Sequence, residues 1–294
     1  MATVSGLVEK YQLIVYMKDI NIVIVNYFSK DDISNAVASI FADLKNSNLT
    51  FQITVVDNSG NQDKIKEELA TKFPAVKYID SGANVGFSKG NNLGFNFCEA
   101  RYYFAFNPDA YIPENSQVIK RLIKFMDENP KIGCVGPKIL NDDGSLQHSC
   151  FRFNKSSILI KPFKHINWDK KHQKIKRYTE ELEMKKFDHS ETRPVDWVLG
   201  AAMMVRGEVA KKIGFFDERY FMYLEDCDWC IRMWEAGFPV YYLHDVIIKH
   251  KYKRDSSKTP GIFKALFRNR LARIHLSSWL KYVWKWRKIH KFYE

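Results

Sequence analysis

The chain has 294 residues, of which 46% are hydrophobic, and a formal net charge of +12. This length allows one large domain or two small ones with a sizeable core, and no apolar run of about 18 residues predicts a membrane-spanning helix. The five cysteines form no even disulfide framework, so we expect a reducing, cytoplasmic setting.

The first elements in chain order alternate between strand and helix patterns. Residues 20–27 are a nearly continuous apolar run, typical of a strand buried in a parallel sheet. Helical spacing at 33–44, a strand at 51–56, a helix at 64–72 and a short strand at 76–79 follow. This order predicts a doubly wound α/β domain, whose ligands bind beyond the carboxyl ends of the strands.

Two polar motifs follow expected strand ends, and a glycine-rich stretch lies between them. Asp57 comes directly after the second strand. Residues 84–94 open a helix with glycines four apart, which matches no dinucleotide or Walker A loop. Those glycines indicate either close approach to a ligand or helix–sheet packing. Asn107-Pro-Asp109 follows another strand; the proline holds Asn107 out of helical angles. In this place Asp109 could bind a hard cation that also contacts phosphate oxygens. The alternative is that the motif is an ordinary turn.

The second half of the chain contains further elements and one irregular stretch. From the sequence we expect, in order, a helix at 114–128, a strand at 132–137, a Lys-rich insertion at 154–194, a helix at 207–213, and strands at 239–243 and 246–250.

Three acids, Glu225, Asp226 and Asp228, stand at the head of another expected helix. Free N–H groups and the helix dipole stabilise carboxylates there, so simple capping is the alternative to catalysis. Cys227 and Cys230 in the same helix have a zinc-like spacing. No second pair accompanies them, and their spacing instead serves the apolar face of the helix.

The C-terminal segment 255–294 mixes lysines and arginines with bulky aromatic residues. This pattern predicts amphipathic helices that contact an anionic membrane surface. A packed C-terminal helix or a homodimer contact is the alternative. The basic charge also fits a nucleic-acid-binding protein, but acidic motifs at strand ends would repel phosphate without a metal, so we expect no nucleic-acid partner.

The order of these motifs resembles the family 2 glycosyltransferases with a GT-A fold. The resemblance covers about residues 19–254. Within the family, the chain is most similar to bacterial L-rhamnosyltransferases of O-antigen or cell-surface polysaccharide assembly. Its pieces are Ile24-Val-Asn-Tyr27, Val55-Val-Asp-Asn-Ser59, Asn84-Val-Gly-Phe87 with Gly90-Asn-Asn92, Asn107-Pro-Asp109, Trp197-Val-Leu-Gly-Ala201 and Tyr223-Leu-Glu-Asp-Cys-Asp228.

We expect three parts of the chain. Residues 1–16 are an N-terminal extension, either native or added to the protein. Residues 17–254 form the GT-A domain, with a Rossmann-like nucleotide-sugar-binding half and an acceptor half. Residues 255–294 are the basic, aromatic helical tail.

The resemblance also implies roles for the matching residues. Asp57 is expected to accept the ring N–H of the nucleobase, Asp109 to hold Mg²⁺ or Mn²⁺ on the diphosphate, and His250 to be a further metal ligand. Many relatives carry aspartate in the place of Asn107, so Asn107 is expected in the donor pocket. The other expected donor-binding residues are Asn26, Asn84, Gly86, Phe87, Lys89, Asn91, Asn92 and Trp197.

Asp226 is expected to be the general base, and Glu225 or Asp228 to orient the acceptor or the loop. Transfer from a nucleoside diphosphate sugar releases a diphosphate, which a divalent cation stabilises. The acceptor hydroxyl loses its proton to one carboxylate as it attacks. A glycosidase would instead place two carboxylates across the bond.

The expected function is an inverting transfer of L-rhamnose from dTDP-L-rhamnose to a saccharide or lipid-diphosphate-linked acceptor. The enzyme is expected to be cytoplasmic and peripheral on the inner face of the membrane. The alternatives are a UDP-hexose or UDP-galactofuranose donor, or an inactive homologue that only binds a sugar nucleotide. A nucleotidyltransferase would show a glycine-rich basic loop after the first strand, unlike residues 26–30.

Overall fold

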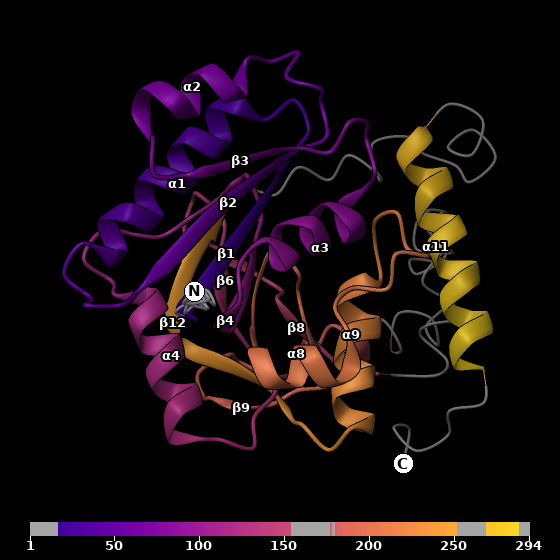
Figure 1. Ribbon diagram of the computed structural model, residues 1–294. Coiled ribbons are helices and arrows are strands. Elements are labelled where there is room, and N and C mark those ends of the chain that lie inside the picture. Colours follow the sequence, from indigo (N-terminus) through magenta and orange to yellow (C-terminus); the bar gives the residue numbers. More distant parts are fainter. Residues whose placement is uncertain (1–16, 154–176, 178–179, 252–268, 288–294) are drawn as a thin grey trace, which may run out of the picture.

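The computed structural model describes residues 17–153, 177, 180–251 and 269–287. In this part a central sheet carries helices on both faces (Figure 1). The helices are α1 (Lys30–Leu44), α2 (Ile65–Lys72), α3 (Phe87–Phe97), α4 (Val118–Glu128), α8 (Gly207–Ile213), α9 (Glu225–Glu235) and α11 (Arg270–Trp286). The longer strands are β1 (Lys18–Asn26), β2 (Phe51–Asp57), β3 (Lys77–Asp80), β4 (Ala100–Phe106), β6 (Cys134–Leu140), β11 (Ala202–Arg206) and β12 (Val240–His250). The two-residue strands are β5 (Ala110–Tyr111), β7 (Leu146–Gln147), β8 (Cys150–Phe151), β9 (Arg193–Pro194) and β10 (Trp197–Val198).

The strand order of the main sheet is β3-β2-β1-β4-β11-β6-β12-β5. Strands β3, β2, β1 and β4 run parallel, which confirms the predicted α/β arrangement of the first half. Strand β11 is antiparallel to both β4 and β6. The parallel half therefore directs the carboxyl ends of β1, β2 and β4 to one edge, where the polar motifs of the sequence lie.

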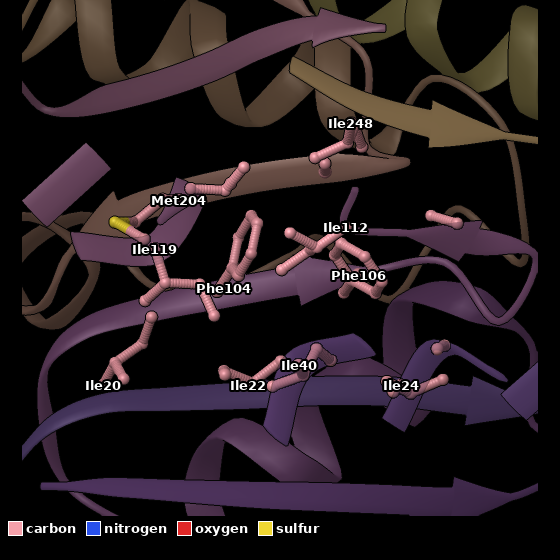
Figure 2. Close-up of a cluster of buried hydrophobic side chains, with 14 of the residues drawn as sticks. Ile20, Ile22, Ile24, Ile40, Phe104, Phe106, Ile112, Ile119, Met204 and Ile248 are labelled. Carbon is pink, nitrogen blue, oxygen red and sulfur yellow. The ribbon is translucent and has the colours of Figure 1, made fainter. Parts of the chain in front are cut away.

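Two apolar layers cover the sheet because alternate residues of each strand point to opposite faces. Ile20, Ile22 and Ile24 of β1 belong to one cluster, which includes Ile40 of α1 and Ile119 of α4 (Figure 2). Val23, which alternates with these isoleucines and points to the other face of the sheet, belongs to a second cluster with residues of α3, α8 and α9. The nearly continuous apolar run of β1 thus reflects burial on both faces.

Helix α4 begins four residues later than the sequence predicts. Asn115 and Gln117 have φ angles of 58° and 49°, so the expected first turn is not helical. The N–H groups of Val118 and Ile119 instead donate to the Asp43 carboxylate at 2.9 Å each. Helix starts need such acceptors, and this one comes from α1, far away in the sequence.

The two strands expected at 239–243 and 246–250 are a single strand, β12. Its pairing with β6 shifts register between Leu243 and Ile247. A bulge of this kind bends a strand without ending it, and the polar residues between the two apolar runs account for the predicted break.

Several expectations fall partly outside the described residues. The extension at 1–16 lies entirely outside them, and so does most of the insertion expected at 154–194. Within the tail, the described helix α11 packs on the second apolar cluster through Tyr282. Across the described residues, no helix is both long and apolar enough to cross a membrane, and the five cysteines are free thiols.

Candidate active site

The carboxyl ends of β1 and β2 bring Asn26 and Asp57 together. The two residues are register partners in the parallel pair. Asn26 Nδ2 donates to Asp57 Oδ1 at 2.9 Å and to Asp63 Oδ2 at 3.0 Å. Both Asn26 and Asp57 are buried. Two of the residues predicted for the donor pocket therefore lie next to each other at the edge where α/β proteins bind ligands.

The Asp57 carboxylate is also bonded to its own turn. Its oxygens accept from the N–H and hydroxyl of Ser59 at 2.8 and 2.6 Å, from Asn61 N–H at 2.6 Å and from the Tyr78 hydroxyl at 3.0 Å. Burial alone would raise the pKa of Asp57, but these hydrogen bonds outweigh it and lower the pKa. A carboxylate has about four lone-pair directions. A nucleobase N–H would therefore bind Asp57 only after a donor such as Tyr78 moves, and that contact stays a prediction.

Two exposed aromatic residues beside Asn26 were not among the predicted site residues. Tyr27 and Phe28 are 44% and 52% exposed, and their rings meet edge to face at 4.8 Å. Phe28 has a φ of 54°, which is uncommon for a residue other than glycine. Nucleobases stack on such rings. Two aromatics directly after a buried strand were the signal that the sequence offered.

The loop before α3 is fastened to the protein rather than left open. Gly86 N–H donates to Asn84 Oδ1 at 3.1 Å, and Gly86 C=O accepts from Asn58 Nδ2 at 3.1 Å. Phe87 N–H donates to Phe221 C=O at 2.7 Å. Gly86 has a φ of 87°, and a Cβ there would lie 2.3 Å from Phe221 O. Glycine is therefore required at this position by contact with the segment that precedes α9.

We expect Gly86→Ala to destabilise the protein more than Gly82→Ala. Both glycines have positive φ angles, +87° and +75°, but a Cβ at Gly82 meets nothing within 4 Å. Backbone strain alone costs about 1–3 kcal/mol, and only the first variant adds a clash with backbone. Equal losses in the free energy of unfolding, measured by urea denaturation, would contradict this reading.

Helix α3 places its polar side chains on different surfaces. Asn92 is buried and clamps the chain before α9, because its Nδ2 donates to Phe216 C=O at 2.9 Å and its Oδ1 accepts from Phe216 N–H at 3.1 Å. Asn91 is buried and donates to Phe87 C=O at 2.9 Å, whereas Lys89 is exposed. The donor-binding roles of these residues stay predictions.

The glycines of α3 pack the helix on the sheet. A Cβ at Gly90 would lie 3.0 Å from Val25 Cγ1, and one at Gly94 would lie 2.5 Å from Val23 Cγ1. Of the two readings of the four-residue glycine spacing, the structure supports helix–sheet packing for both positions.

The structure joins the two residues predicted as metal ligands. Asp109 follows β4 and His250 ends β12, and Asp109 Oδ1 lies 3.1 Å from His250 Nε2. Asn107 Nδ2 lies 3.2 Å from the same ring nitrogen. The other ring nitrogen, Nδ1, lies 3.1 Å from Gln147 Oε1. His250 is 5% exposed, so the ring is held firmly with one edge toward Asp109.

This donor set fits a divalent cation. An amide oxygen such as Gln147 Oε1 only accepts, so a neutral His250 carries its proton on Nδ1. The Nε2 lone pair then faces both the Asn107 amide and the Asp109 carboxylate, and a cation held by Nε2 and Asp109 would replace the contact with Asn107. Hydrogen bonding at the far nitrogen is usual for a metal-binding histidine. Among the described residues no group of three His, Cys, Asp or Glu side chains forms a complete site, so substrate or water would supply the remaining ligands.

Asp226 lies in the first turn of α9 and is 7% exposed. Its Oδ2 accepts from Gly200 N–H at 2.9 Å, and its Oδ1 accepts from Cys227 N–H at 2.7 Å. Tyr223 and Leu224 directly before α9 have φ angles of 75° and 70°. This strained turn sets where the helix begins and so fixes the position of the Asp226 carboxylate.

The turn at 199–201 links the base candidate to the metal motif. Gly200 N–H bonds Asp226, and the next residue, Ala201, accepts from Asn107 N–H through its C=O at 2.9 Å. A Cβ at Gly200 would lie 3.3 Å from Asp226 Cβ. The contribution of Gly200 was not predicted, because the contact joins residues 26 positions apart.

Asp228 and Trp197 take positions that the sequence did not predict. The Asp228 carboxylate is fully buried, and Arg232, Tyr220 and the C-terminal helix α11 provide its partners. Of the two roles predicted for it, these contacts favour holding a loop over orienting an acceptor. Trp197 stacks on Phe151 at 4.1 Å with an interplanar angle of 17°. Its donor contact stays a prediction, as does the orienting role of the buried Glu225.

The model of the family described as Glycosyl transferase family 2 matches residues 21–192. The chain belongs to this family. A second model, Glycosyl transferase family group 2, matches residues 164–291. These matches confirm the predicted family and identify the chain as a glycosyltransferase.

Two curated relatives support this assignment, and one solved structure supports the fold. The chain is 27% identical over 225 residues to an N-acetylglucosaminyl-diphospho-decaprenol L-rhamnosyltransferase of Mycobacterium tuberculosis, covering 71% of this chain and 69% of the relative. It is 29% identical to a dTDP-rhamnosyl transferase RfbF of Shigella flexneri, covering 76% and 67%. The structure of GalNAc-T7 with UDP, GalNAc and Mn²⁺ superposes with a TM-score of 0.62 at 13% identity over 92% of this chain and 48% of that one. The last likeness concerns the fold alone and confirms GT-A architecture.

Proposed function

We propose that this glycosyltransferase inverts the anomeric centre of L-rhamnose as it moves the sugar from dTDP-L-rhamnose to a saccharide or lipid-diphosphate-linked saccharide. The observation that carries the proposal is the turn at Gly200 and Ala201. Gly200 bonds Asp226, and Ala201 bonds Asn107, which lies two residues before Asp109. A base and a metal-binding carboxylate are therefore tied to one short segment.

Asp109 and His250 would hold Mn²⁺ or Mg²⁺, and Gln147 would keep the His250 ring in the metal-binding tautomer. The bound cation supplies Lewis-acid stabilisation of the departing diphosphate. Asn26, Asp57 and the exposed Tyr27 ring at the neighbouring strand end would bind the nucleobase.

Asp226 would act as the general base. As the acceptor oxygen bonds to the anomeric carbon, the bond from that carbon to the diphosphate oxygen breaks, and the hydroxyl proton passes to the Asp226 carboxylate. The backbone N–H groups of Gly200 and Cys227 hold both carboxylate oxygens. This anchoring keeps the base in one orientation, which is the main requirement for efficient proton transfer.

The donor is inferred from the relatives, whose names specify an L-rhamnosyltransferase and a dTDP-rhamnosyl transferase. The test is a transfer assay with Mn²⁺, an N-acetylglucosaminyl-diphospho-lipid acceptor, and either dTDP-L-rhamnose or a UDP-hexose or UDP-galactofuranose donor. We expect product from dTDP-L-rhamnose alone, with inverted anomeric configuration by NMR. Product from a UDP-sugar alone would establish the alternative donor, and retained configuration would exclude the single displacement.

We further propose that residues 17–254 form the catalytic domain and that the tail attaches it peripherally to the inner face of the cytoplasmic membrane. Helix α11 turns a row of side chains to solvent, and Leu280 and Trp284 in that row are 55% and 64% exposed. Arg270, Arg273 and Arg287 extend the exposed row at both ends. Apolar residues flanked by arginines suit an anionic lipid surface.

We expect the double variant Leu280→Glu, Trp284→Glu to lose binding to vesicles that contain anionic lipid. Burial of one such side chain contributes about 1.5–3 kcal/mol, so loss of both should lower the partition coefficient by at least roughly 100-fold. Leu146→Glu, at a position 37% exposed on β7, is the matched control. Co-sedimentation of the double variant at the level of the control would remove α11 as the membrane contact.

A further inference from the structure

Helix α11 lies beside α9 (Figure 1) and bonds the chain segment that leads into it. Ser278 is 1% exposed, and its hydroxyl donates to Met222 C=O at 2.8 Å. One turn further, Lys281 Nζ donates to Arg219 C=O at 2.7 Å. The helix therefore holds the backbone of this segment at two points, and a loop has few other ways to satisfy its carbonyl groups when covered.

The end of α11 also neutralises a buried carboxylate. Lys285 Nζ lies 2.6 Å from Asp228 Oδ1 and 2.8 Å from Asp217 Oδ2, and Trp286 Nε1 donates to Asp228 Oδ1 at 2.9 Å. Asp228 is fully buried, and Arg232 Nε is its other charged partner at 2.9 Å. A buried carboxylate that loses a partner is strongly disfavoured, so the start of α9 depends on α11 remaining docked.

The segment between these contacts contains the strained turn of the candidate active site. Tyr223 and Leu224 are two consecutive residues with positive φ angles, and Asp226 follows them. Residues in this region of backbone space keep their conformation only where the surroundings impose it. The Ser278 bond precedes the strained pair and the Lys285 contact follows it, so α11 supplies restraints on both sides.

The same turn reaches the donor loop. Phe221 is next to Met222, and its C=O accepts from Phe87 N–H at 2.7 Å. Gly86 has no side chain, so Phe221 O can approach this loop closely. A continuous set of bonds thus runs from Ser278 through Met222 and Phe221 to Phe87. We propose that α11 is a brace that positions the donor loop and the base together, with Ser278 and Lys285 as its positioning residues.

The proposal rests on the proposed function for its catalytic meaning but not for its test. Hydrogen exchange of the full chain, measured by mass spectrometry without nucleotide, compares Ser278→Ala with Ser277→Ala. Ser277 is the exposed neighbour on the same helix, so the chemical change is identical. Loss of one hydrogen bond should speed exchange at residues 84–90 by roughly two- to tenfold in the Ser278 variant alone. Exchange in α4, on the opposite face of the sheet, should not change.

The activity readout separates this inference from the proposed function. If wild-type protein transfers sugar, Ser278→Ala should lower kcat/KM for the donor by a similar factor, and Ser277→Ala should not. Lys285→Met, which keeps the aliphatic stem, should have a larger effect on both readouts. Equal exchange at 84–90 in the serine variants would overturn the brace. If the wild-type protein transfers no sugar but Ser278→Ala still speeds exchange at residues 84–90, the brace is supported and the proposed function is overturned.

Discussion

Replacement of Asp226 by asparagine is expected to remove nearly all sugar transfer while donor binding remains nearly intact. Asparagine keeps the size of the side chain and an oxygen that can accept from Gly200 or Cys227 N–H. It cannot take the proton of the acceptor hydroxyl. General-base catalysis contributes roughly 10²- to 10⁴-fold in rate, and we expect kcat to fall by that factor.

The control for this variant is Asp245→Asn, which makes the same change at a carboxylate 52% exposed in a surface ion pair with Arg121. Donor affinity is measured by calorimetry and the rate by release of the nucleoside diphosphate. Near wild-type kcat in Asp226→Asn would show that another group accepts the proton. Loss of donor affinity together with kcat would instead make Asp226 a donor-binding residue.

Replacement of Asp109 by alanine should remove the dependence of donor binding on Mn²⁺. The variant loses the carboxylate 3.1 Å from His250 Nε2 and leaves one protein ligand for the cation. Groups that merely support a metal ligand contribute about 10- to 100-fold in metal affinity. Loss of a direct ligand should therefore weaken manganese-dependent donor binding by at least roughly 100-fold, and chelation with EDTA should reproduce the effect in the wild type.

Asp142→Ala is the matched control, because among the described contacts the Asp142 carboxylate accepts only from the Tyr111 hydroxyl, and its bond to Lys249 Nζ comes from its backbone C=O. It should bind donor and Mn²⁺ as the wild type does. If Asp109→Ala binds the donor with unchanged affinity and an unchanged response to Mn²⁺, the pair of Asp109 and His250 is not the metal site.

The sequence predicted elements whose cause is local. Strand β1 is recognisable because both of its faces are buried, and α8 because small and apolar residues there repeat with helical spacing. The predicted start of α4 was wrong because the N–H groups that begin this helix bond Asp43 from another helix. The predicted division of β12 into two strands was wrong because a register shift lets one strand continue through polar residues.

The candidate site divides in the same way. The strand-end positions of Asp57 and Asp109 followed from the order of motifs, and the pairing of Asp109 with His250 agrees with the resemblance. Gln147, Gly200 and the clamp of Asn92 on Phe216 were missed, since each contact joins residues far apart in sequence. Their patterns carry no local signal that distinguishes them from packing residues.

The role of the acidic run also depended on tertiary contacts. Asp226 and Asp228 are two residues apart on one helix, so their side chains point in different directions. The first is bonded by the Gly200 turn and the second by Lys285 and Trp286 of α11. The resemblance gave Asp226 the role of the base. The contacts of Asp228 with α11 were not predicted, because Lys285 and Trp286 lie more than 50 positions further along the chain.

The most direct test of a metal-dependent sugar-nucleotide enzyme is the thermal stability of the purified full chain. dTDP-L-rhamnose, UDP-glucose, UDP-galactose and GDP-mannose would each be added with and without Mn²⁺. Ligand at about 100 times its Kd stabilises the native state by roughly 2.7 kcal/mol, which raises Tm by several degrees in a protein of this size. We predict a manganese-dependent rise with dTDP-L-rhamnose. The absence of any manganese-dependent rise with all four donors would contradict the account.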